Sequence, residues 1–362
     1  MIVTDAGIGD IEAIESFFNK VVRSDYPTVR ENYFQWQFVE TDRIFGKEDN
    51  KGAIMLMDRD EVKGVALASK TPFFFHNETL VGGCHHEWFV EPELIGRGFG
   101  YQLLQELLER NSIILAGGQS LYYTNLMGRS RKTHWFETPR LYTVLNVTDA
   151  EKLLLSSGPP TKSYLELCSK VPDHNVLSSK RMACFDETYD QFWLDARDAY
   201  LIAINKTASY MNWRYIKHPV FHYDCWCYET VAGLAYFVWR CEKVQGTSLS
   251  VTRICEAIGN PTSISLAYPT ACNQIKAMGA TIVDFFCTCA QTNMALAESG
   301  MHYVITQPDF NLPRLYSPLS DDPRKSINWS LSISDELFKM DHRNYSQCYF
   351  TKGDSNQDRP NI

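Results

Sequence analysis

The 362-residue sequence lacks any uninterrupted apolar run of about 18 residues, the length that a helix needs to cross a membrane. Its first residues lead into Asp5 and Asp10, whereas a secretion signal begins with basic residues followed by an apolar stretch. These two absences argue against a membrane-spanning or a secreted protein. We therefore expect a cytoplasmic protein that does not insert into membranes.

An excess of basic residues is missing as well. The chain carries 35 Lys and Arg residues against 43 Asp and Glu residues, for a net charge of −8. A broad nucleic-acid footprint needs basic patches that displace counterions from the phosphates. We therefore expect no nucleic-acid partner.

The cysteines lack the spacing of a zinc site. Cys225 and Cys227 are separated by one residue, as are Cys287 and Cys289, whereas zinc knuckles have two to four intervening residues. Alternate positions share one face of a strand, which favours packing over ligation. We expect no metal, and we expect the 11 cysteines to be reduced because no secretion signal is recognised.

What the sequence does contain is a glycine-rich turn between a strand and a helix, in residues 87–110. Residues 88–90 continue a run of strand-forming residues, and Gly96, Gly98 and Gly100 follow at alternate positions before a leucine-rich helix. Because glycine has no Cβ atom, such a turn can aim its N–H groups and those of the helix N-terminus at one anion. The pattern predicts a pyrophosphate site.

Two common phosphate-binding motifs do not fit this turn. A Walker loop ends in Gly-Lys-Ser/Thr, but Tyr101 and Gln102 follow Gly100. A dinucleotide-binding turn has its last glycine two residues later, with an acidic residue about 20 positions further on. The ligand is therefore expected to be a different pyrophosphate compound.

The turn resembles the signature of the GNAT superfamily of acyl-CoA-dependent N-acyltransferases, in which Arg/Gln-x-x-Gly-x-Gly/Ala follows a strand that ends in Val-x-Pro. Residues 90–92 and 96–100 match this pattern, while Ile95 stands where the family has Arg or Gln. The resemblance implies acetyl-CoA or another acyl-CoA as co-substrate, held mainly by backbone N–H groups. It assigns to the cofactor Phe89, Val90, Ile95, Gly96, Arg97, Gly98, Phe99, Gly100 and Asn125.

An internal repeat predicts two domains. Three landmarks recur in the same order at a nearly constant offset of about 170 residues. They are residues 33–38 (YFQWQF) and 210–215 (YMNWRY), Thr124-Asn125 and Thr292-Asn293, and residues 139–142 and 313–316 (both PRLY). We expect tandem copies of one unit, in residues 1–165 and 166–362.

Periodicity places the elements of each copy. The first is expected to have helices at residues 8–22, 26–38 and 101–109, strands at 53–57, 62–70 and 79–90, and a strand region at 112–116 and 119–123. The second is expected to have a helix at 192–204 and strands at 225–228 and 233–241. Together with the resemblance, these imply an α/β (α+β) fold of two tandem GNAT-like domains. Each domain is a mixed, mainly antiparallel twisted sheet flanked by helices.

The second copy departs from the first at the turn. There it has only Gly259, followed by Asn260 and Pro261. Proline has no N–H group to offer and restricts the residue before it. We expect this domain not to bind CoA, and to build part of the acceptor site in the cleft between domains.

Acyl transfer to an amine needs a group that accepts the amine proton, because an alkylammonium ion with a pKa near 10 is mostly protonated at neutral pH. In the family this group is a carboxylate or an ordered water near the strand before the loop. Glu87 is the first candidate here and His86 the second. A regular strand would point them to opposite faces, but a bulge would remove that alternation. The alternative is that both only hydrogen-bond neighbouring loops.

Other family positions are not matched. The tyrosine that protonates the departing thiolate in many members is missing. Either Tyr122, Tyr123 or water is the donor, or no general acid is needed. Arg129, Arg131 and Lys132, expected on a helix, either contact the 3′-phosphate of CoA or form a solvated charged face.

Three functions remain open from the sequence. The first is an N-acyltransferase that acts on a small-molecule amine. Residues 212–215 and 350–354 and the tandem layout resemble bacterial proteins of surface-polysaccharide gene clusters, which implies an amino sugar or a nucleotide-linked amino sugar. The second is an aminoacyl-tRNA-dependent peptide ligase of tandem GNAT form. The third is a non-catalytic interaction protein that retains the fold.

Overall fold

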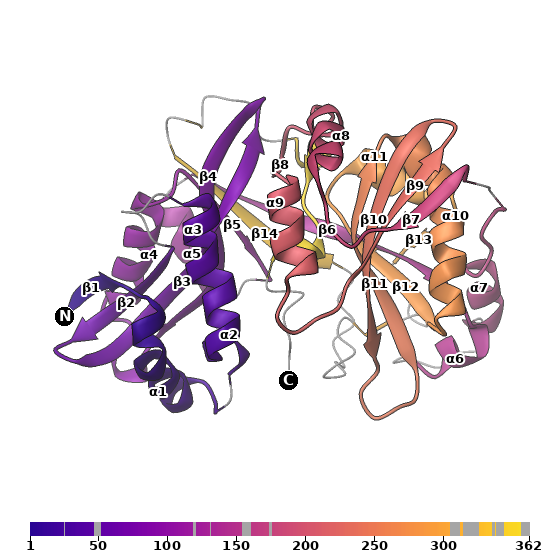
Figure 1. Ribbon diagram of the computed structural model, residues 1–362. Coiled ribbons are helices and arrows are strands. Elements are labelled where there is room, and N and C mark those ends of the chain that lie inside the picture. Colours follow the sequence, from indigo (N-terminus) through magenta and orange to yellow (C-terminus); the bar gives the residue numbers. More distant parts are fainter. Residues whose placement is uncertain are drawn as a thin grey trace.

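The computed structural model describes residues 1–24, 26–46, 52–118, 121–130, 132–153, 161–173, 176–304, 312–313, 326–334, 337 and 344–355. Two lobes lie side by side, one built from the N-terminal elements and the other from the later part of the chain (Figure 1). Between them lie α8 (Glu187–Arg197), β8 (Ile202–Ile204) and α9 (Ala208–Met211).

The first lobe is built on a sheet whose N-terminal strands are antiparallel neighbours. These strands are β1 (Ile2–Asp5), β2 (Ala53–Asp58), β3 (Glu61–Phe75) and β4 (Glu78–Val90). His76 and Asn77 form the β3–β4 turn, with φ values of 46° and 69°. β5 (Ile113–Gly117) pairs with β4 in parallel, as the helical crossover between them requires.

Helices cover both faces of this sheet. α1 (Ile11–Val21), α2 (Glu31–Phe34) and α3 (Glu40–Phe45) follow β1, while α4 (Phe99–Glu109) and α5 (Leu121–Ser130) follow β4 and β5. Alternate residues of β2 divide between the two cores. Met55 packs with the core of α1, and Leu56 packs with the core of α4, because successive strand residues face opposite sides.

The second lobe repeats this order. Its sheet contains β7 (Ser178–Arg181), β9 (Asp224–Thr230), β10 (Gly233–Lys243), β11 (Ser250–Gly259) and β12 (Ile282–Phe286), with β11 and β12 parallel. Its larger helices are α10 (Pro261–Ala277) and α11 (Ala290–Glu298), and α6 (Val147–Glu151) and α7 (Thr161–Leu167) lie at its outer side (Figure 1). The expected fold class, a mainly antiparallel mixed sheet flanked by helices in each half, is confirmed.

A strand irregularity recurs at the same place in both halves. In the first, Leu67 pairs with Glu87 and Ala68 with His85, so that His86 is left over as a bulge. In the second, Val238 pairs with Glu256 and Trp239 with Ile254, which leaves Cys255 over. A bulge puts one extra residue into a strand and redirects the side chains after it.

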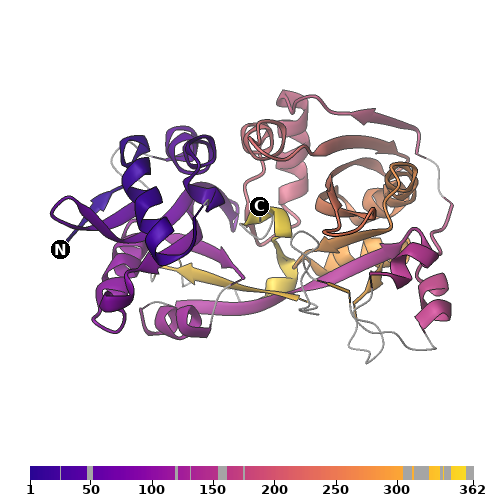
Figure 2. The same cartoon turned by 90° about the horizontal axis from the view of Figure 1, so that it is seen from below.

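The two halves exchange strands. β14 (Ser326–Ile333), from late in the chain, lies between β5 and β6 (Lys132–Val144) in the first lobe. The far end of β6 enters the second lobe, where Arg140 to Val144 pair with β12 and where Leu141 and Tyr142 pair with β13 (His302–Tyr303). Figure 2 shows β6 running from one lobe to the other. The strand pairing therefore crosses residue 165, and the expected division into residues 1–165 and 166–362 stays a prediction.

The repeated YFQWQF and YMNWRY segments meet each other at the boundary between lobes. The Trp36 and Trp213 rings are stacked, with centroids 4.7 Å apart and planes inclined by 16°. Each indole donates a hydrogen bond to the other residue's carbonyl, at 3.0 Å from Trp36 and 2.9 Å from Trp213. Both tryptophans lie in π-helical turns, Gln35–Val39 and Asn212–Ile216. The two copies of the repeated segment thus bind each other through equivalent contacts.

The C-terminal segment is threaded between the lobes. β15 (Cys348–Tyr349) pairs with β8, and β8 pairs with β3 of the first lobe. Residues 348–355 are all buried. The thiol of Cys84 in β4 donates to the carbonyl of Asp354 at 3.3 Å, which joins this segment to the first lobe.

A buried ion cluster fixes the same segment to the second lobe. Lys206 lies 2.5 Å from Glu256 in β11 and also pairs with Asp354. The hydroxyl of Tyr215 donates to Glu256 at 2.5 Å. Complete burial raises the pKa of Glu256 to about 7. The two carboxylates outweigh the desolvation of Lys206 and raise the pKa of its ammonium group.

Three expected elements are wrong. Residues 121–123 begin helix α5 instead of ending a strand, while 119 and 120 lie outside the described residues. The helix expected at 192–204 ends at Arg197, because Ile202–Ile204 is recruited as β8 by pairing with Phe73 to Phe75. The charged run is not on one helix: Arg129 lies in the last turn of α5, Lys132 begins β6, and Arg131 is not described.

The tryptophan pair gives a stability prediction. Trp213→Phe should keep most of the packing but leave the buried carbonyl of Trp36 without its indole donor, at a cost of about 1–3 kcal/mol. Trp239→Phe is the matched control, because the Trp239 indole is equally buried and has no hydrogen-bond partner among the described residues. Urea unfolding should show a clearly larger loss for Trp213→Phe. Equal losses would mean that the hydrogen bond contributes nothing.

Glu256 gives a pH prediction. In the folded protein the carboxyl group of Glu256 has a pKa of about 7, whereas the ordinary pKa of a glutamate is 4.5. The folded state therefore binds more protons between these values, so its stability should fall as the pH rises through this window. Glu256→Gln should flatten that decline, measured as unfolding free energy at pH 5 and pH 7. Glu298→Gln, which changes an exposed carboxylate, should show the same decline in stability as the parent. An unchanged decline in Glu256→Gln would contradict a raised pKa of Glu256.

Candidate functional site

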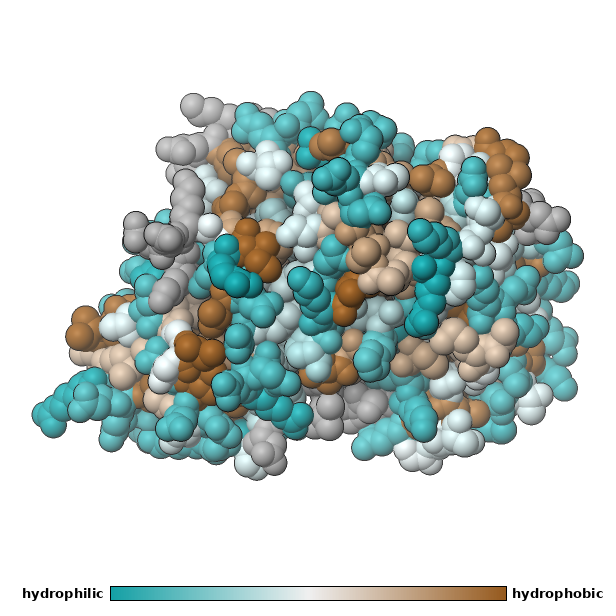
Figure 3. All heavy atoms as spheres, viewed as in Figure 1, coloured by the Kyte–Doolittle hydropathy of each residue, from teal (hydrophilic) through white to brown (hydrophobic). Residues whose placement is uncertain are grey.

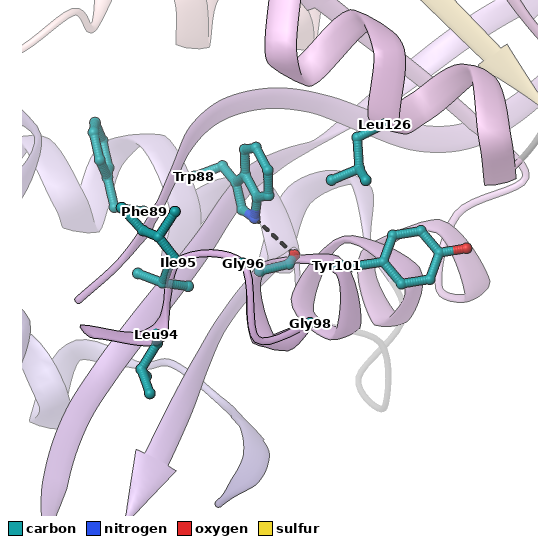
Figure 4. A pocket seen from close by; sticks show the side chains of 10 residues that line it. Trp88, Phe89, Leu94, Ile95, Gly96, Gly98, Tyr101 and Leu126 are labelled. Carbon is teal, nitrogen blue, oxygen red and sulfur yellow. Dashed lines mark hydrogen bonds between the residues drawn. The ribbon is translucent and has the colours of Figure 1, made fainter. Parts of the chain in front are cut away.

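The first lobe contains a wedge between two parallel strands. Pairing joins Gly83 to Ile114 and ends with His85 and Ala116. Beyond that point β4 continues along β3 to Val90, while β5 stops at Gly117. A pocket of about 670 Å³ occupies the opening, lined by Trp88, Phe89, Val90, Leu94, Ile95, Gly96, Gly98, Gly100, Tyr101 and Leu126 (Figure 4).

The glycine turn forms one rim of this pocket. Gly96 and Gly98 have φ values of +79° and +90°, which side chains rarely adopt, and Gly98 is the residue that precedes α4. A Cβ atom added at either glycine would meet nothing within 4 Å. Both glycines are exposed, so the turn faces open space.

Several N–H groups of the turn have no acceptor in the part of the chain that the structure describes. Ile95 and Arg97 donate to the carbonyls of Pro92 and Leu94, at 3.2 and 3.1 Å. The N–H groups of Gly96, Gly98, Phe99 and Gly100 have no hydrogen-bond acceptor among the described residues. The last three also belong to the open first turn of α4, where the helix dipole favours an anion.

Gly100 is required for a different reason. Its Cβ would lie 3.0 Å from Cζ2 of Trp88, closer than ordinary van der Waals contact. The Trp88 indole donates a 2.9 Å hydrogen bond to the carbonyl of Gly100, the dashed line in Figure 4. The third glycine therefore lets Trp88 tie the end of β4 to the start of α4.

The residues assigned to the cofactor from the sequence fall into two groups. Phe89, Val90, Ile95, Gly96, Gly98 and Gly100 line the pocket. Arg97 and Phe99 belong to the same turn without lining the described pocket, and Asn125 is exposed on α5, next to the lining residue Leu126. Sequence reasoning missed Trp88, Leu94, Tyr101 and Leu126, although Trp88 and Tyr101 flank the motif directly.

The two candidate bases lie on the same side of β4. The bulge removes the alternation of their side chains. Glu87 faces Tyr26 and Thr28, and the centroid of the His86 ring lies 5.9 Å from that of the Phe38 ring. Glu87 is buried and accepts hydrogen bonds at both oxygens, from Tyr26 at 2.9 Å and from Thr28 at 3.2 Å. Nε2 of His86 lies 2.8 Å from the Ser69 hydroxyl.

A third polar group closes the inner end of the wedge. The His85 ring lies 2.8 Å from the hydroxyl of Tyr123 and 3.1 Å from the carbonyl of Glu87. Burial lowers the pKa of His85 to about 4, so that its imidazole is neutral at pH 7. Burial likewise raises the pKa of Tyr123, which keeps its hydroxyl protonated. The side chain of Tyr122 is not described.

In the second lobe the strand that corresponds to β4 leads into its helix without a glycine turn. β11 passes through Gly259 directly into α10, and the side chain of Asn260 accepts the N–H of Ser263 at 2.9 Å. The C-terminal segment also fills the region beside β11. The hydroxyl of Tyr349 lies 3.0 Å from Glu256 and accepts the N–H of Ala257 at 3.0 Å. The backbone that would face a ligand is thus already satisfied.

The surface carries no continuous apolar band on the face drawn in Figure 3, where hydrophobic side chains form small separate patches among hydrophilic ones. Within the described part of the chain, no helix is both long and apolar enough to cross a membrane. The described residues also contain no group of three or more His, Cys, Asp and Glu side chains arranged to hold a metal ion.

Several solved structures that are similar to this chain are N-acyltransferases. Saccharomyces cerevisiae N-myristoyltransferase with bound myristoyl-CoA is similar over 91% of this chain and 82% of its own, with a TM-score of 0.55 and 10% identity. A GCN5-related N-acetyltransferase from Kribbella flavida matches 92% of this chain and 71% of its own, with a TM-score of 0.54 and 12% identity. One from Anabaena variabilis matches 92% and 72%, with a TM-score of 0.56 and 10% identity.

The sequence itself matches no known family profile, and no curated protein matches it significantly. At these identities the likeness concerns the fold. The chain shares the fold of these structures over both lobes.

Proposed function

We propose that this protein is an N-acyltransferase that moves an acyl group, acetyl first of all, from acyl-CoA to the amine of a small molecule. The observation that carries the proposal is the set of N–H groups at Gly96, Gly98, Phe99 and Gly100, which have no acceptor among the described residues. They lie at the mouth of an apolar pocket and at the start of a helix, an arrangement suited to a diphosphate joined to a long, weakly polar arm.

The side chains of the glycine turn suggest that the backbone binds the pyrophosphate. Ile95 stands where a long polar side chain is found in the family and projects from the exposed turn beside Gly96 (Figure 4). The pyrophosphate would therefore be held by N–H groups and the helix dipole, while Trp88, Val90 and Leu126 contact the pantetheine arm. The expected contacts of Arg97, Phe99 and Asn125 with the outer part of CoA remain part of this proposal.

The closed end of the wedge supports a short acyl group. β4 and β5 are paired again at His85 and Ala116, and the His85 ring is held there by Tyr123 and the Glu87 carbonyl. A long acyl chain that continued in this direction would have to displace a buried, hydrogen-bonded ring. We therefore expect acetyl-CoA to be a better donor than long-chain acyl-CoA.

The second half supports an acceptor site instead of a second cofactor site. Its ligand-facing backbone is occupied by Tyr349, yet Trp213 and the C-terminal segment bring it against β4. We propose that residues 1–165 bind acyl-CoA and that residues 166–362 complete the acceptor pocket. An amino sugar is the acceptor class that the sequence resemblance implies.

The first test places a charge in the glycine turn. Gly98→Glu should abolish binding of CoA, because a carboxylate in this turn repels the diphosphate and obstructs the N–H groups. Gly279→Glu is the matched control, since Gly279 has a φ of +82° and is also open around its Cβ. Calorimetric titration with CoA should show binding by the control and the parent only. Equal affinity in all three proteins would contradict the site, and binding by none would favour a non-catalytic role.

The second test concerns the donor. Rates of acyl transfer should be measured with acetyl-CoA, butyryl-CoA and octanoyl-CoA and corrected for hydrolysis of the thioester. They should fall by at least tenfold from acetyl to octanoyl, because the wedge closes at His85. Affinity for CoA itself, measured in parallel, should be unchanged. Faster transfer from octanoyl-CoA would disprove the short-chain assignment and would leave the cofactor site intact.

A further inference from the structure

The side chain of Trp88 spans the glycine turn. Its Nε1 donates a 2.9 Å hydrogen bond to the carbonyl of Gly100, which lies 12 residues further along the chain. Trp88 is near the end of β4, and Gly100 is in the first turn of α4. The bond therefore joins the two elements that hold the glycine turn between them (Figure 4).

The backbone hydrogen bonds inside the turn act only over short spans. Leu94 donates to the carbonyl of Glu91 at 2.9 Å, and Ile95 and Arg97 donate in the same way to carbonyls earlier in the turn. Bonds of this span fix the local shape of the turn but not its position relative to β4. The Trp88 bond does fix that position, because its donor is in the strand and its acceptor is in the helix.

The indole is itself held from the closed end of the wedge. The Tyr123 ring on α5 meets it edge to face, with the ring centroids 5.8 Å apart. The hydroxyl of Tyr123 lies 2.8 Å from the ring of His85, which belongs to the last residue pair joining β4 to β5. One line of contacts therefore runs from the point where the two strands separate to the start of α4.

The backbone conformation of Gly100 does not require a glycine. Gly96 and Gly98 have positive φ values, but Gly100 lies in helical backbone, where alanine is favoured over glycine. The obstacle is the indole. A Cβ atom added at Gly100 would lie 3.0 Å from Cζ2, 3.5 Å from Cε2 and 3.7 Å from Nε1 of Trp88. The missing side chain of Gly100 thus makes room for Trp88.

We infer that Trp88 and Gly100 form an interlocked pair that positions the glycine turn, and that Gly100 is a glycine because of the indole and not because of the diphosphate. Trp88 is then a positioning residue for the cofactor. The inference rests on the proposed function, since it concerns the turn that would bind acyl-CoA. Gly100→Ala keeps the N–H group of this residue, so it acts on the cofactor through the displaced indole.

The experiment measures CoA affinity by calorimetric titration of the parent, Gly100→Ala, Trp88→Phe and the double variant. Phenylalanine has no N–H group and no atom equivalent to Cζ2, so it breaks the bond to the Gly100 carbonyl and also removes the closest contact. Each single variant should weaken CoA binding by about 5- to 20-fold, as the loss of one hydrogen bond would. The double variant should bind no more weakly than Trp88→Phe, because there is no indole left to displace.

Gly98→Ala is the matched control. A Cβ atom at Gly98 would meet nothing within 4 Å and so would not touch the indole, but its φ of +90° disfavours a side chain. This variant should weaken CoA binding by the same factor with and without Trp88→Phe. If Gly100→Ala also costs the same factor in both backgrounds, the interlock is wrong.

A second measurement needs no ligand. In protein isotopically labelled at its glycines, NMR relaxation reports the backbone order of Gly96 and Gly98. Gly279 is the reference, because it too has a positive φ and open space around its Cβ position. Trp88→Phe should lower the order of Gly96 and Gly98 and leave Gly279 unchanged. Unchanged order in the turn would overturn the positioning role and leave Trp88 as a wall of the pocket only.

The two measurements distinguish this inference from the proposed function. A parent protein that binds no CoA overturns the proposed function, while NMR relaxation still tests the interlock. A parent that binds CoA, with single-variant losses that multiply in the double variant, overturns the interlock alone. A variant that is merely destabilised would lower the calorimetric stoichiometry and leave the Kd for CoA unchanged, which would also contradict a positioning role.

Discussion

The reciprocal contact between Trp36 and Trp213 determines how the two halves of this chain are arranged. Each indole donates to the carbonyl of the other, and their rings are stacked. Such a contact requires the two segments to face each other with the same local geometry, which the paired π-helical turns provide. Once this register is set, β6 and β14 can cross between the lobes, and the C-terminal segment can lie against β4. The bulge at His86 then faces a boundary between lobes and not solvent.

The two halves contain similar sheets, but the regions after the corresponding strands differ. In the first lobe the glycine turn leaves N–H groups without acceptors beside an open pocket. In the second lobe the hydroxyl of Tyr349 accepts the N–H of Ala257, and Asn260 and Pro261 begin α10 immediately after β11. A segment of the chain itself thus occupies the region where a second ligand would lie. This segment is buried together with Lys206 and Glu256.

The sequence predicted what depends on local chemistry. The glycine turn at residues 96–100, the strands after residue 53 and the repeated tryptophan segments were all recognisable, because turns and periodic strands depend on nearby residues. It did not predict that 202–204 forms β8 or that β14 belongs to the first lobe, since those pairings join residues more than a hundred positions apart. The candidate site was found only in part. Trp88 and Leu126 become lining residues through the splay of β4 from β5, which no local pattern encodes.

The two bulges also differ in the residues that surround them. Glu87 and Glu256 follow the bulge in their respective halves, and both are buried carboxylates that accept hydrogen bonds from tyrosine hydroxyls. A role shared by a half with an open wedge and a half with a filled one is more readily structural than catalytic. The bulged residue itself differs: His86 in the first half and Cys255 in the second, where Cys255 is fully buried beneath the C-terminal segment. The two bulges therefore share their backbone geometry and the buried carboxylate that follows, but not the side chain of the extra residue.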